Sequence, residues 1–290
     1  MAQFDFPSMF RLKPGRRVRL RDQDSSWSGG HRDKEEVAQL MERNLKRLTE
    51  AQELLWASES YALLIVLQAM DTAGKDGLIR HVMSGVNPQG CYVVPFKQPS
   101  SEEMAHDFLW RYAEKMPAKG RIGIFNRSHY EEVLVVRVHP ELLEHEHVTQ
   151  KDGPKLWKQR FDDINEFERH LARNRTVILK FFLHISKREQ KKRLLERLDN
   201  PDKHWKFSPS DIAEREYWSD YVEAYEEALK ATSTEHAPWY ILPADHKWVT
   251  HWVASEIIAK TIRKLDLKIP PLAPEQEKAL ARARRVLTKE

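Results

Sequence analysis

Short apolar runs alternate with amphipathic stretches along most of this sequence. Five runs have the length and composition of buried strands, at residues 61–67, 92–96, 121–125, 176–185 and 239–242. Apolar positions at helical spacing predict helices at residues 34–58, 75–84, 101–116, a stretch ending near 138, 156–172, 187–198, 212–230 and 247–265. Such alternation favours right-handed crossovers and a mostly parallel five-stranded sheet with helices on both faces. The expected fold class is therefore α/β.

The first strand passes directly into a turn that has the layout of a phosphate-binding loop. A Gly74-Lys75 pair stands between this strand and a predicted helix, where backbone N–H groups can hold phosphate oxygens while the lysine reaches the transferred group. The pattern G-x-x-x-x-G-K-[ST] would have glycine at Ala69 and Ser or Thr at Asp76. An ordinary strand–turn–helix with a surface lysine is therefore the alternative. Asp71 or Asp76 could replace the missing hydroxyl as a hard oxygen ligand for magnesium.

Polar residues follow three of the predicted strands at their carboxyl ends. They are the turn at 74–75, the segment Phe96-Lys97-Gln98 and the pair Asn126-Arg127. Ligands of open α/β sheets bind at the carboxyl ends of the strands. The sequence therefore predicts that these residues share one site.

Arg127 is the candidate phosphate ligand of the third strand. Because it directly follows that strand, its planar guanidinium can bind phosphate oxygens from a rigid base. A salt bridge to Glu131 one helical turn later is the alternative. Asn126 is an amide where many phosphate-loop kinases have an acid, which leaves more of the metal binding to Asp71 and Asp76.

Basic residues gather at 11–21 and at 187–197, and such clusters can recruit a polyanion. The alternative is a solvated helix face together with a mobile, polar N-terminal arm at 1–33. The helix at 187–198 repeats like charges four residues apart, which weakens an isolated helix by roughly a few tenths of a kcal/mol per pair. This favours a lid at about 187–215 that binds an anionic ligand. The acidic residues Asp162, Asp163, Glu166 and Glu168 are predicted to form a solvated helix face.

Length and composition exclude several classes of protein. The 290 residues contain no Gly/Ser-rich linker, which favours one domain over residues 1–290 with a proline-containing tail at 266–290. Cys91 is the only cysteine, so an intramolecular disulfide and a cysteine-rich zinc site are excluded. No apolar stretch reaches about 18 residues, so we expect a cytoplasmic chain without a membrane partner. The net charge of +4 is modest and the tryptophans form no stacking motif, so nucleic acid is not an expected partner.

Four motifs in order resemble those of the polyphosphate kinase 2 family. They are Ala-Met-Asp-Thr-Ala-Gly-Lys-Asp-Gly at 69–77, Phe-Asn-Arg-Ser-His-Tyr-Glu at 125–131, the stretch at 197–207 and Ala-Pro-Trp-Tyr at 237–240. The resemblance extends over about 14–265. It implies a P-loop kinase fold with a helical lid, and phosphoryl transfer between inorganic polyphosphate and nucleotides with Mg²⁺, or Mn²⁺ in its place. It also implies a homo-oligomer, either a dimer or a tetramer.

The resemblance also implies roles for individual residues. Those expected to be catalytic are Asp71, Lys75, Arg127, Arg193 and Arg197. Those expected to bind phosphate are Ala73, Gly74, Lys75, Asp76, Gly77, Lys203 and Lys206, with Asp71 and Asp76 as metal ligands. Those expected near the nucleotide are Phe96, Lys97, Gln98, Asn126, Arg127 and Glu131, the first three on position alone. Asn126 followed by Arg-Ser-His-Tyr-Glu resembles the subgroup that accepts both AMP and ADP, so adenine nucleotides are the expected acceptors, with guanine nucleotides as a further class.

Two other functions stay open at this point. An ATP-dependent nucleoside monophosphate kinase would use the same loop but would need an adenine-binding clamp, which the sequence does not reveal. A non-enzymatic polyanion-binding protein would explain the basic clusters but not the polar residues at the strand ends.

Overall fold

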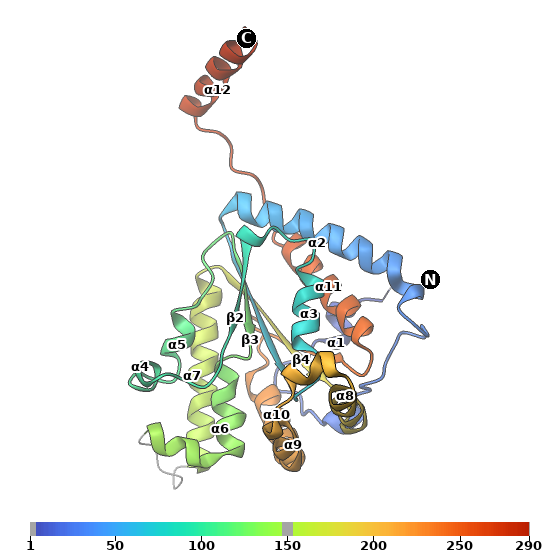
Figure 1. Cartoon of the computed structure of the whole chain (residues 1–290). Helices are drawn as coiled ribbons and strands as arrows, with labels where there is room; N and C mark the ends of the chain where they lie inside the picture. Colours follow the sequence, from blue (N-terminus) through green and yellow to red (C-terminus); the bar gives the residue numbers. More distant parts are fainter. Residues whose placement is uncertain (1–3, 147–152, 290) are drawn as a thin grey trace.

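The computed structural model describes residues 4–146 and 153–289. Its central feature is a five-stranded sheet with the order β2-β3-β1-β4-β5 (Figure 1). The strands are β1 (Ala62–Ala69), β2 (Cys91–Pro95), β3 (Ile122–Asn126), β4 (Thr176–His184) and β5 (Trp239–Pro243). All neighbouring pairs are parallel, so the carboxyl ends of the five strands lie at one edge. The predicted parallel α/β sheet is confirmed.

β1 lies at the centre of the sheet and has no exposed residue. The apolar run at 62–67 follows from this position, because helices cover both faces of a parallel sheet. The register places Leu67 of β1 opposite Asn126 of β3 and Phe181 of β4. The loop after β1 and the residues after β3 are therefore neighbours at the carboxyl edge, as the sequence predicts.

Helices pack on both faces of the sheet (Figure 1). One group consists of α2 (Ala38–Ser58), α3 (Lys75–Val82) and α11 (Lys247–Arg263). α11 contacts both other helices and β5, and α3 contacts β1 and β3. The other consists of α6 (Val135–Val138), α7 (Gly153–Arg173) and α10 (Trp218–Thr232), with α7 packed on β4. One hydrophobic core runs through both groups.

The N-terminal segment differs from the predicted mobile, irregular arm. Residues Phe6–Phe10 form helix α1, and the Phe6 ring is fully buried with its centroid 4.8 Å from that of Trp252 on α11. The N–H of Leu12 donates to the carbonyl of Trp239 at 2.8 Å, which ties the segment to the edge strand β5. The prediction of an irregular arm was wrong because a few apolar residues among the basic ones, such as Phe6 and Leu12, pack into the core. Residues 1–3 of the predicted arm lie outside the described residues.

Two predicted helices are interrupted. The stretch at 101–116 contains α4 (Ser101–Met104) and α5 (Trp110–Ala113), separated where the Asp107 side chain accepts from the N–H of Leu109 at 2.9 Å. Aspartate competes in this way for backbone groups that a continuous helix would use. The stretch at 212–230 likewise divides into α9 (Pro209–Glu214), a short 3₁₀ turn at 215–217 and α10.

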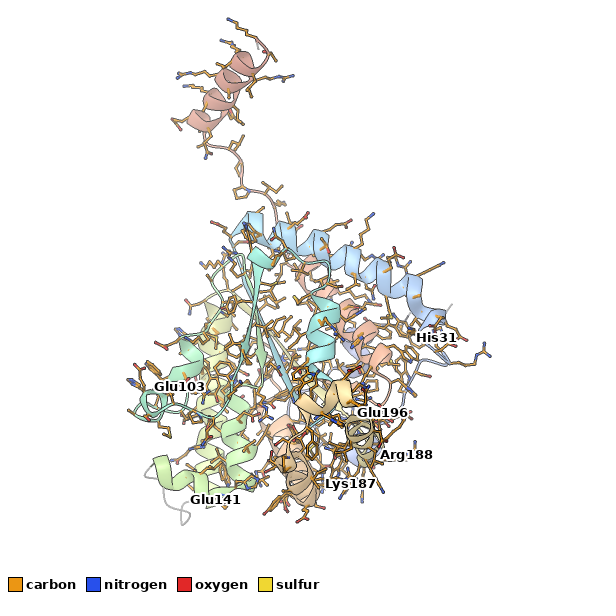
Figure 2. The ribbon with its side chains drawn as sticks, viewed as in Figure 1. His31, Glu103, Glu141, Lys187, Arg188 and Glu196 are labelled. Carbon is orange, nitrogen blue, oxygen red and sulfur yellow. The ribbon has the colours of Figure 1, made fainter. Side chains whose placement is uncertain are left out.

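Residues 187–217 contain the segment predicted as a lid at about 187–215, and we call them the lid segment. It begins with α8 (Lys187–Asp199), whose N-terminus is capped by Ser186 accepting from the N–H of Glu189. The 3₁₀ helix η7 (Pro201–Lys206) and α9 follow. Figure 2 shows the charged side chains of Lys187, Arg188 and Glu196 on α8 at the surface of the molecule.

The C-terminal tail lies apart from the sheet. Helix α12 (Pro274–Leu287) has no buried residue and projects away from the body of the molecule (Figure 1). A helical tail was predicted beyond the prolines, and α12 confirms it. Among the described residues, no helix combines the length and apolar character needed to cross a bilayer.

Candidate active site

The loop between β1 and α3 forms the floor of the site. Gly74 has φ +111°, a conformation that side-chain-bearing residues rarely adopt, and it precedes the first residue of α3. Thr72 also has a positive φ of 63°. These turns direct the chain sharply from the strand into the helix. The loop therefore presents the free N–H groups of the α3 N-terminus at the carboxyl edge of the sheet.

Lys75 lies across this loop. Its Nζ is 3.3 Å from the carbonyl oxygen of Ala69, to which it donates a hydrogen bond. Burial lowers the pKa of Lys75, and the positive charge of Arg127 lowers it further. Two cations that destabilise each other in this way favour an anion between them. The lysine has the environment of a phosphate ligand rather than that of a solvated surface residue.

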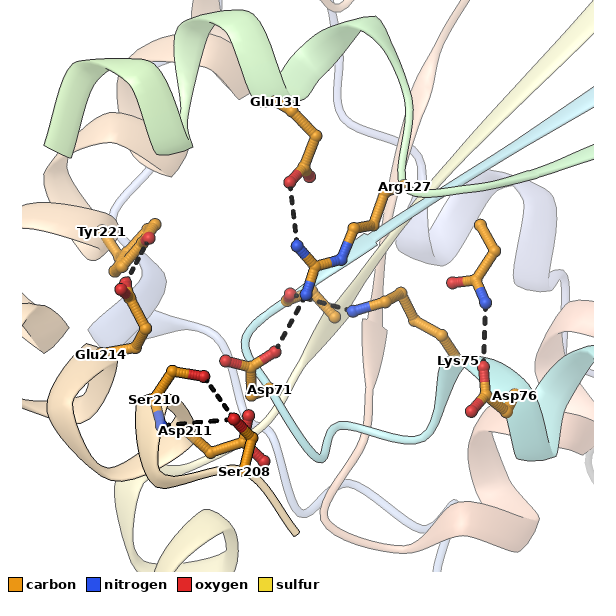
Figure 3. Close-up of polar contacts among 12 residues, drawn as sticks. Asp71, Lys75, Asp76, Arg127, Glu131, Ser208, Ser210, Asp211, Glu214 and Tyr221 are labelled. Carbon is orange, nitrogen blue, oxygen red and sulfur yellow. Dashed lines mark hydrogen bonds and ion pairs between the residues drawn. The ribbon is translucent and has the colours of Figure 1, made fainter. Parts of the chain in front are cut away.

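Arg127 stands between two carboxylates (Figure 3). Its Nη2 is 3.5 Å from Oδ1 of Asp71, and its Nη1 donates to Oε2 of Glu131 at 3.3 Å. Glu131 raises the pKa of Arg127 despite burial, and Asp71 adds to this effect. The salt bridge to Glu131 that the sequence offers as the alternative is present, and it holds the guanidinium beside the loop after β1.

The backbone of Arg127 is strained. Its φ is +67°, in the left-handed region, and its N–H donates to the carbonyl of Leu67 at 3.2 Å. For a residue with a β-carbon, such a conformation costs on the order of 1 kcal/mol or more, and it is common at functional sites. The turn directs the side chain from the end of β3 toward Asp71 instead of along the strand.

Two cavities open at this edge of the sheet. The larger, which we call the basic groove, has a volume of about 560 Å³ and runs over the phosphate-binding loop. Its cations are Lys75, Arg80, Arg127, Arg193, Arg197, Lys203, Lys206 and Lys247, and its acids are Asp71, Asp76 and Glu196. The excess of positive charge would favour a negatively charged ligand in the groove. Ala73, Gly74 and Gly77, predicted to bind phosphate, also line it, and so does Asn126, which was predicted near the nucleotide.

The smaller cavity, which we call the aromatic cavity, has a volume of about 230 Å³. Its lining includes the rings of Trp218, Tyr221 and Tyr225 and the carboxylates of Glu131, Asp211 and Glu214. The hydroxyl of Tyr221 donates to Glu214 at 2.6 Å (Figure 3). Burial raises the pKa of Asp211, and the nearby charge of Asp71 raises it further. Flat apolar surfaces beside hydrogen-bonding groups are suited to a base and a ribose.

Asp71 and Arg127 are the two residues common to both cavities. A group bound in the basic groove and a second group bound in the aromatic cavity would therefore meet at this pair. The arrangement can bring a phosphate chain and a second phosphorylated molecule end to end.

Sequence reasoning missed most of the aromatic cavity. Trp218, Tyr221 and Tyr225 recur at helical spacing, and this pattern predicts a core-facing side of a helix equally well. It also missed Lys247, which begins α11 just after β5. The rule that ligands bind at the carboxyl ends of strands would have found Lys247 if applied to the last strand.

The two arginines predicted from α8 differ in their surroundings. The N–H donors of Arg193 are directed at the carbonyls of Thr72, Ala73, Ala244 and Asp245 and at the carboxylate of Glu189, at 2.7–3.1 Å. A guanidinium has five N–H groups, so no donor is left for a phosphate in this arrangement. Arg193 therefore ties α8 to the phosphate-binding loop. Arg197 donates to Asp211 at 2.8 Å and lines the basic groove together with Lys203 and Lys206.

The segment predicted to contact a nucleotide at 96–98 lines neither cavity. Phe96 is buried against the rings of Tyr112 and Phe125. The carbonyl of Lys97 accepts from Arg111 at 2.8 Å. β2 is the edge strand, and β3 separates its end from the phosphate-binding loop, so a nucleotide contact at 96–98 stays a prediction.

A divalent metal fits the site if phosphates supply most of its ligands. Asp71 and Asp76 both line the basic groove, and Asp76 accepts from the Asn126 amide at 2.8 Å. In the described part of the chain, no group of three or more His, Cys, Asp or Glu side chains could hold a metal by itself. Mg²⁺ commonly uses one or two carboxylates together with substrate phosphates and water. The donor set therefore matches the two predicted ligands.

Comparisons with known proteins give a consistent result. Residues 31–269 match the family described as Polyphosphate kinase 2. The chain is 48% identical to the ADP-polyphosphate phosphotransferase of Rhodopseudomonas palustris, over 97% of this chain and 98% of that protein. It is 45% identical to the AMP/ADP-polyphosphate phosphotransferase of Meiothermus ruber, over 93% and 97%. A crystal structure of Polyphosphate Kinase 2 from Arthrobacter aurescens TC1 superposes with a TM-score of 0.85 at 40% identity, covering 95% of this chain and 96% of that one.

Proposed function

Because this chain belongs to the polyphosphate kinase 2 family, we propose that it transfers the terminal phosphoryl group of inorganic polyphosphate to AMP and to ADP. The products are ADP and ATP. The polyphosphate:nucleotide phosphotransferase activity follows from the family and from relatives that align over nearly their whole length. The proposed acceptors, AMP and ADP, are inferred from the names of those two relatives. One name gives ADP, and the other gives both AMP and ADP.

The observation that carries this proposal is the meeting of the two cavities at Asp71 and Arg127. The basic groove suits polyphosphate, which carries about one negative charge per phosphate. The aromatic cavity suits the acceptor nucleotide, with its base against the rings and its phosphate toward Arg127. The donor and acceptor phosphates would then face each other at the shared pair, as an in-line displacement requires.

In the proposed reaction, a phosphate oxygen of the acceptor attacks the terminal phosphorus of the chain. The bond from that phosphorus to the bridging oxygen breaks, and the shortened polyphosphate leaves. Lys75 and Arg127 neutralise charge on the transferred group, and the α3 N-terminus holds its oxygens. Closure of the lid segment over the groove would exclude water and suppress hydrolysis.

A divalent cation, which we propose to be Mg²⁺ with Mn²⁺ as a substitute, would be held by Asp71 and Asp76. It would screen the negative charge of the facing phosphates. Asn126 would orient Asp76 through its amide hydrogen bond. Guanine nucleotides as further acceptors, assembly into a dimer or tetramer and a cytoplasmic location stay predictions.

The first test supplies purified protein with AMP, Mg²⁺ and long-chain polyphosphate in the absence of ATP. We expect ADP to appear first and ATP after it, both followed by ion-exchange chromatography. ADP without ATP would restrict the acceptor to AMP. If no product forms until ATP is added, the chain is a monophosphate kinase and the proposal is wrong.

Lys203 supplies a second prediction, because it is exposed and lines the basic groove. We expect Lys203→Ala to weaken polyphosphate binding severalfold at low salt, measured by calorimetry without nucleotide. The slope of log Kd against log salt concentration should fall by about 1, since one phosphate contact is lost. Lys278→Ala on the exposed helix α12 is the matched control and should leave the slope unchanged. Equal slopes for all three proteins would remove Lys203 from the binding site.

A further inference from the structure

A buried ion pair lies among the elements that support the turn carrying Arg127. Lys180 of β4 and Glu168 of α7 are fully buried, with Nζ 2.6 Å from Oε2. Lys180 also donates to the carbonyl of Thr232 on α10 at 2.8 Å. The predicted solvated face is therefore wrong for Glu168, because α7 turns this residue toward the sheet.

The pair is joined directly to the residues that follow Arg127. Oε1 of Glu168 accepts from the Tyr130 hydroxyl at 2.9 Å and lies 3.2 Å from Nε2 of His129. Lys180 donates to the same Tyr130 hydroxyl at 2.8 Å. His129 and Tyr130 are both fully buried. His129 and Tyr130 begin the 3₁₀ helix at 129–133 that follows Arg127, so the first two residues of this helix are bound to one charged pair.

On the side facing β1, the turn is held by two hydrogen bonds that are longer than those between Tyr130 and the buried ion pair. Arg127 is tied to β1 through its N–H, and Ser128 accepts from Gln68 of the same strand at 3.2 Å. The turn must keep Arg127 at a φ of +67°, which is unfavourable for an arginine. The contacts of His129 and Tyr130 with the buried ion pair are therefore needed to hold the turn in this conformation.

Stability alone does not account for the pair. Taking two charges out of water costs several kcal/mol per ion, and apolar residues of similar volume often replace such a pair with little loss of stability. Burial works to raise the pKa of Glu168, but Lys180 and His129 outweigh it and hold that pKa below its usual range. The carboxylate therefore stays charged and accepts hydrogen bonds from the turn. These hydrogen bonds fix the orientation of the turn, whereas apolar side chains at the same positions would offer no hydrogen bonds to it.

We propose that Lys180 and Glu168 are positioning residues for phosphoryl transfer, which fix the turn at 126–131 through His129 and Tyr130 and so aim Arg127 at the transferred phosphate. The inference rests on the proposed function for its activity readout. Neither residue lines the basic groove or the aromatic cavity. They act on the reaction through Arg127 and touch no substrate.

The test replaces both charges together in the double variant Lys180→Met/Glu168→Leu, which avoids leaving one charge buried alone. We expect kcat to fall about 10- to 100-fold, because displacement of a catalytic group by about 1 Å has an effect of that size. The KM for polyphosphate should stay within about twofold, since the groove is intact. If the double variant does not fold, Tyr130→Phe removes only the hydroxyl that links the pair to the turn, and the same split is expected.

Coupling to Arg127 separates positioning from a general structural effect. In an Arg127→Lys background the double replacement should lower kcat much less than in the wild type, because residues that act as a unit are not additive. Gln52→Leu is the matched control, a buried polar residue on α2 whose side chain accepts from Asn87 away from the site. It should change thermal stability without changing kcat.

Hydrogen exchange gives a readout that does not depend on activity. The amides of Arg127 and Glu131 should exchange at least about 10-fold faster in the double variant, relative to amides in the centre of β1. A folded double variant with wild-type kcat and unchanged exchange would overturn the proposal, and so would losses of kcat that multiply with Arg127→Lys. A wild type that transfers nothing from polyphosphate would refute the proposed function instead, and exchange would still test the positioning role.

Discussion

Arg127→Ala is expected to lower kcat for transfer from polyphosphate to AMP by about 10³-fold or more. An arginine that stabilises the charge of a phosphoryl-transfer transition state typically contributes 10³- to 10⁵-fold. We expect a loss toward the upper end of this range, because Arg127 lines both cavities and is held in place by Glu131 and Asp71. The measurement is kcat from initial rates of ADP formation at saturating substrates, with folding checked by circular dichroism.

The matched control for this variant is Arg169→Ala. Arg169 is a partly exposed arginine on α7 that forms an ion pair with Glu166, three residues earlier on the same helix. Its replacement should leave kcat unchanged. Retention of more than about a tenth of the wild-type kcat in a folded Arg127→Ala protein would show that the transferred group does not meet this guanidinium.

Lys75→Ala is expected to lower kcat by about 10²- to 10³-fold, the usual effect of removing one charged donor from a site where negative charge develops. The fold should persist, because the side chain of Lys75 makes one direct hydrogen bond, to the Ala69 carbonyl, and no ion pair within 4 Å among the described residues. Relief of the repulsion between Lys75 and Arg127 should also leave thermal stability unchanged or slightly higher. Initial rates and thermal unfolding measure the two effects.

Lys97→Ala is the control for Lys75. Lys97 is an exposed lysine at the same edge of the sheet, but it lines neither cavity. We expect normal kcat and a normal KM for AMP. A raised KM for AMP in Lys97→Ala would show that the acceptor nucleotide binds near the end of β2. Normal turnover in Lys75→Ala would refute the role of the loop lysine.

The residues of this site that lie at the ends of strands can be predicted from the sequence. Gly74, Lys75, Asn126 and Arg127 each follow a recognisable apolar strand, and the rule for parallel sheets brings such positions together. The same rule does not bring residues 96–98 to either cavity, since it states which edge a ligand uses but not which strands flank it. Strand order decides that, and it depends on long-range pairing.

The aromatic cavity shows a second limit. Its rings come from one helix, where helical spacing predicts only that one side is apolar. Whether that side meets the core or a cavity depends on how closely neighbouring elements approach. Glu168 shows the converse, because an acidic stretch that reads as solvated contains one carboxylate that the tertiary structure places in the core against Lys180.

The α/β class, the loop after β1, the place of Arg127 beside it and the family could all be inferred from the sequence, because each depends on neighbouring residues and on the local rules of strands, turns and helices. The three-dimensional structure was needed to show which cavities those residues share, that backbone carbonyls occupy Arg193, and that Lys180 and Glu168 contact Tyr130 close to Arg127. These features depend on contacts between residues far apart in the chain. Local periodicity carries no information about such contacts, since packing of the whole core sets them.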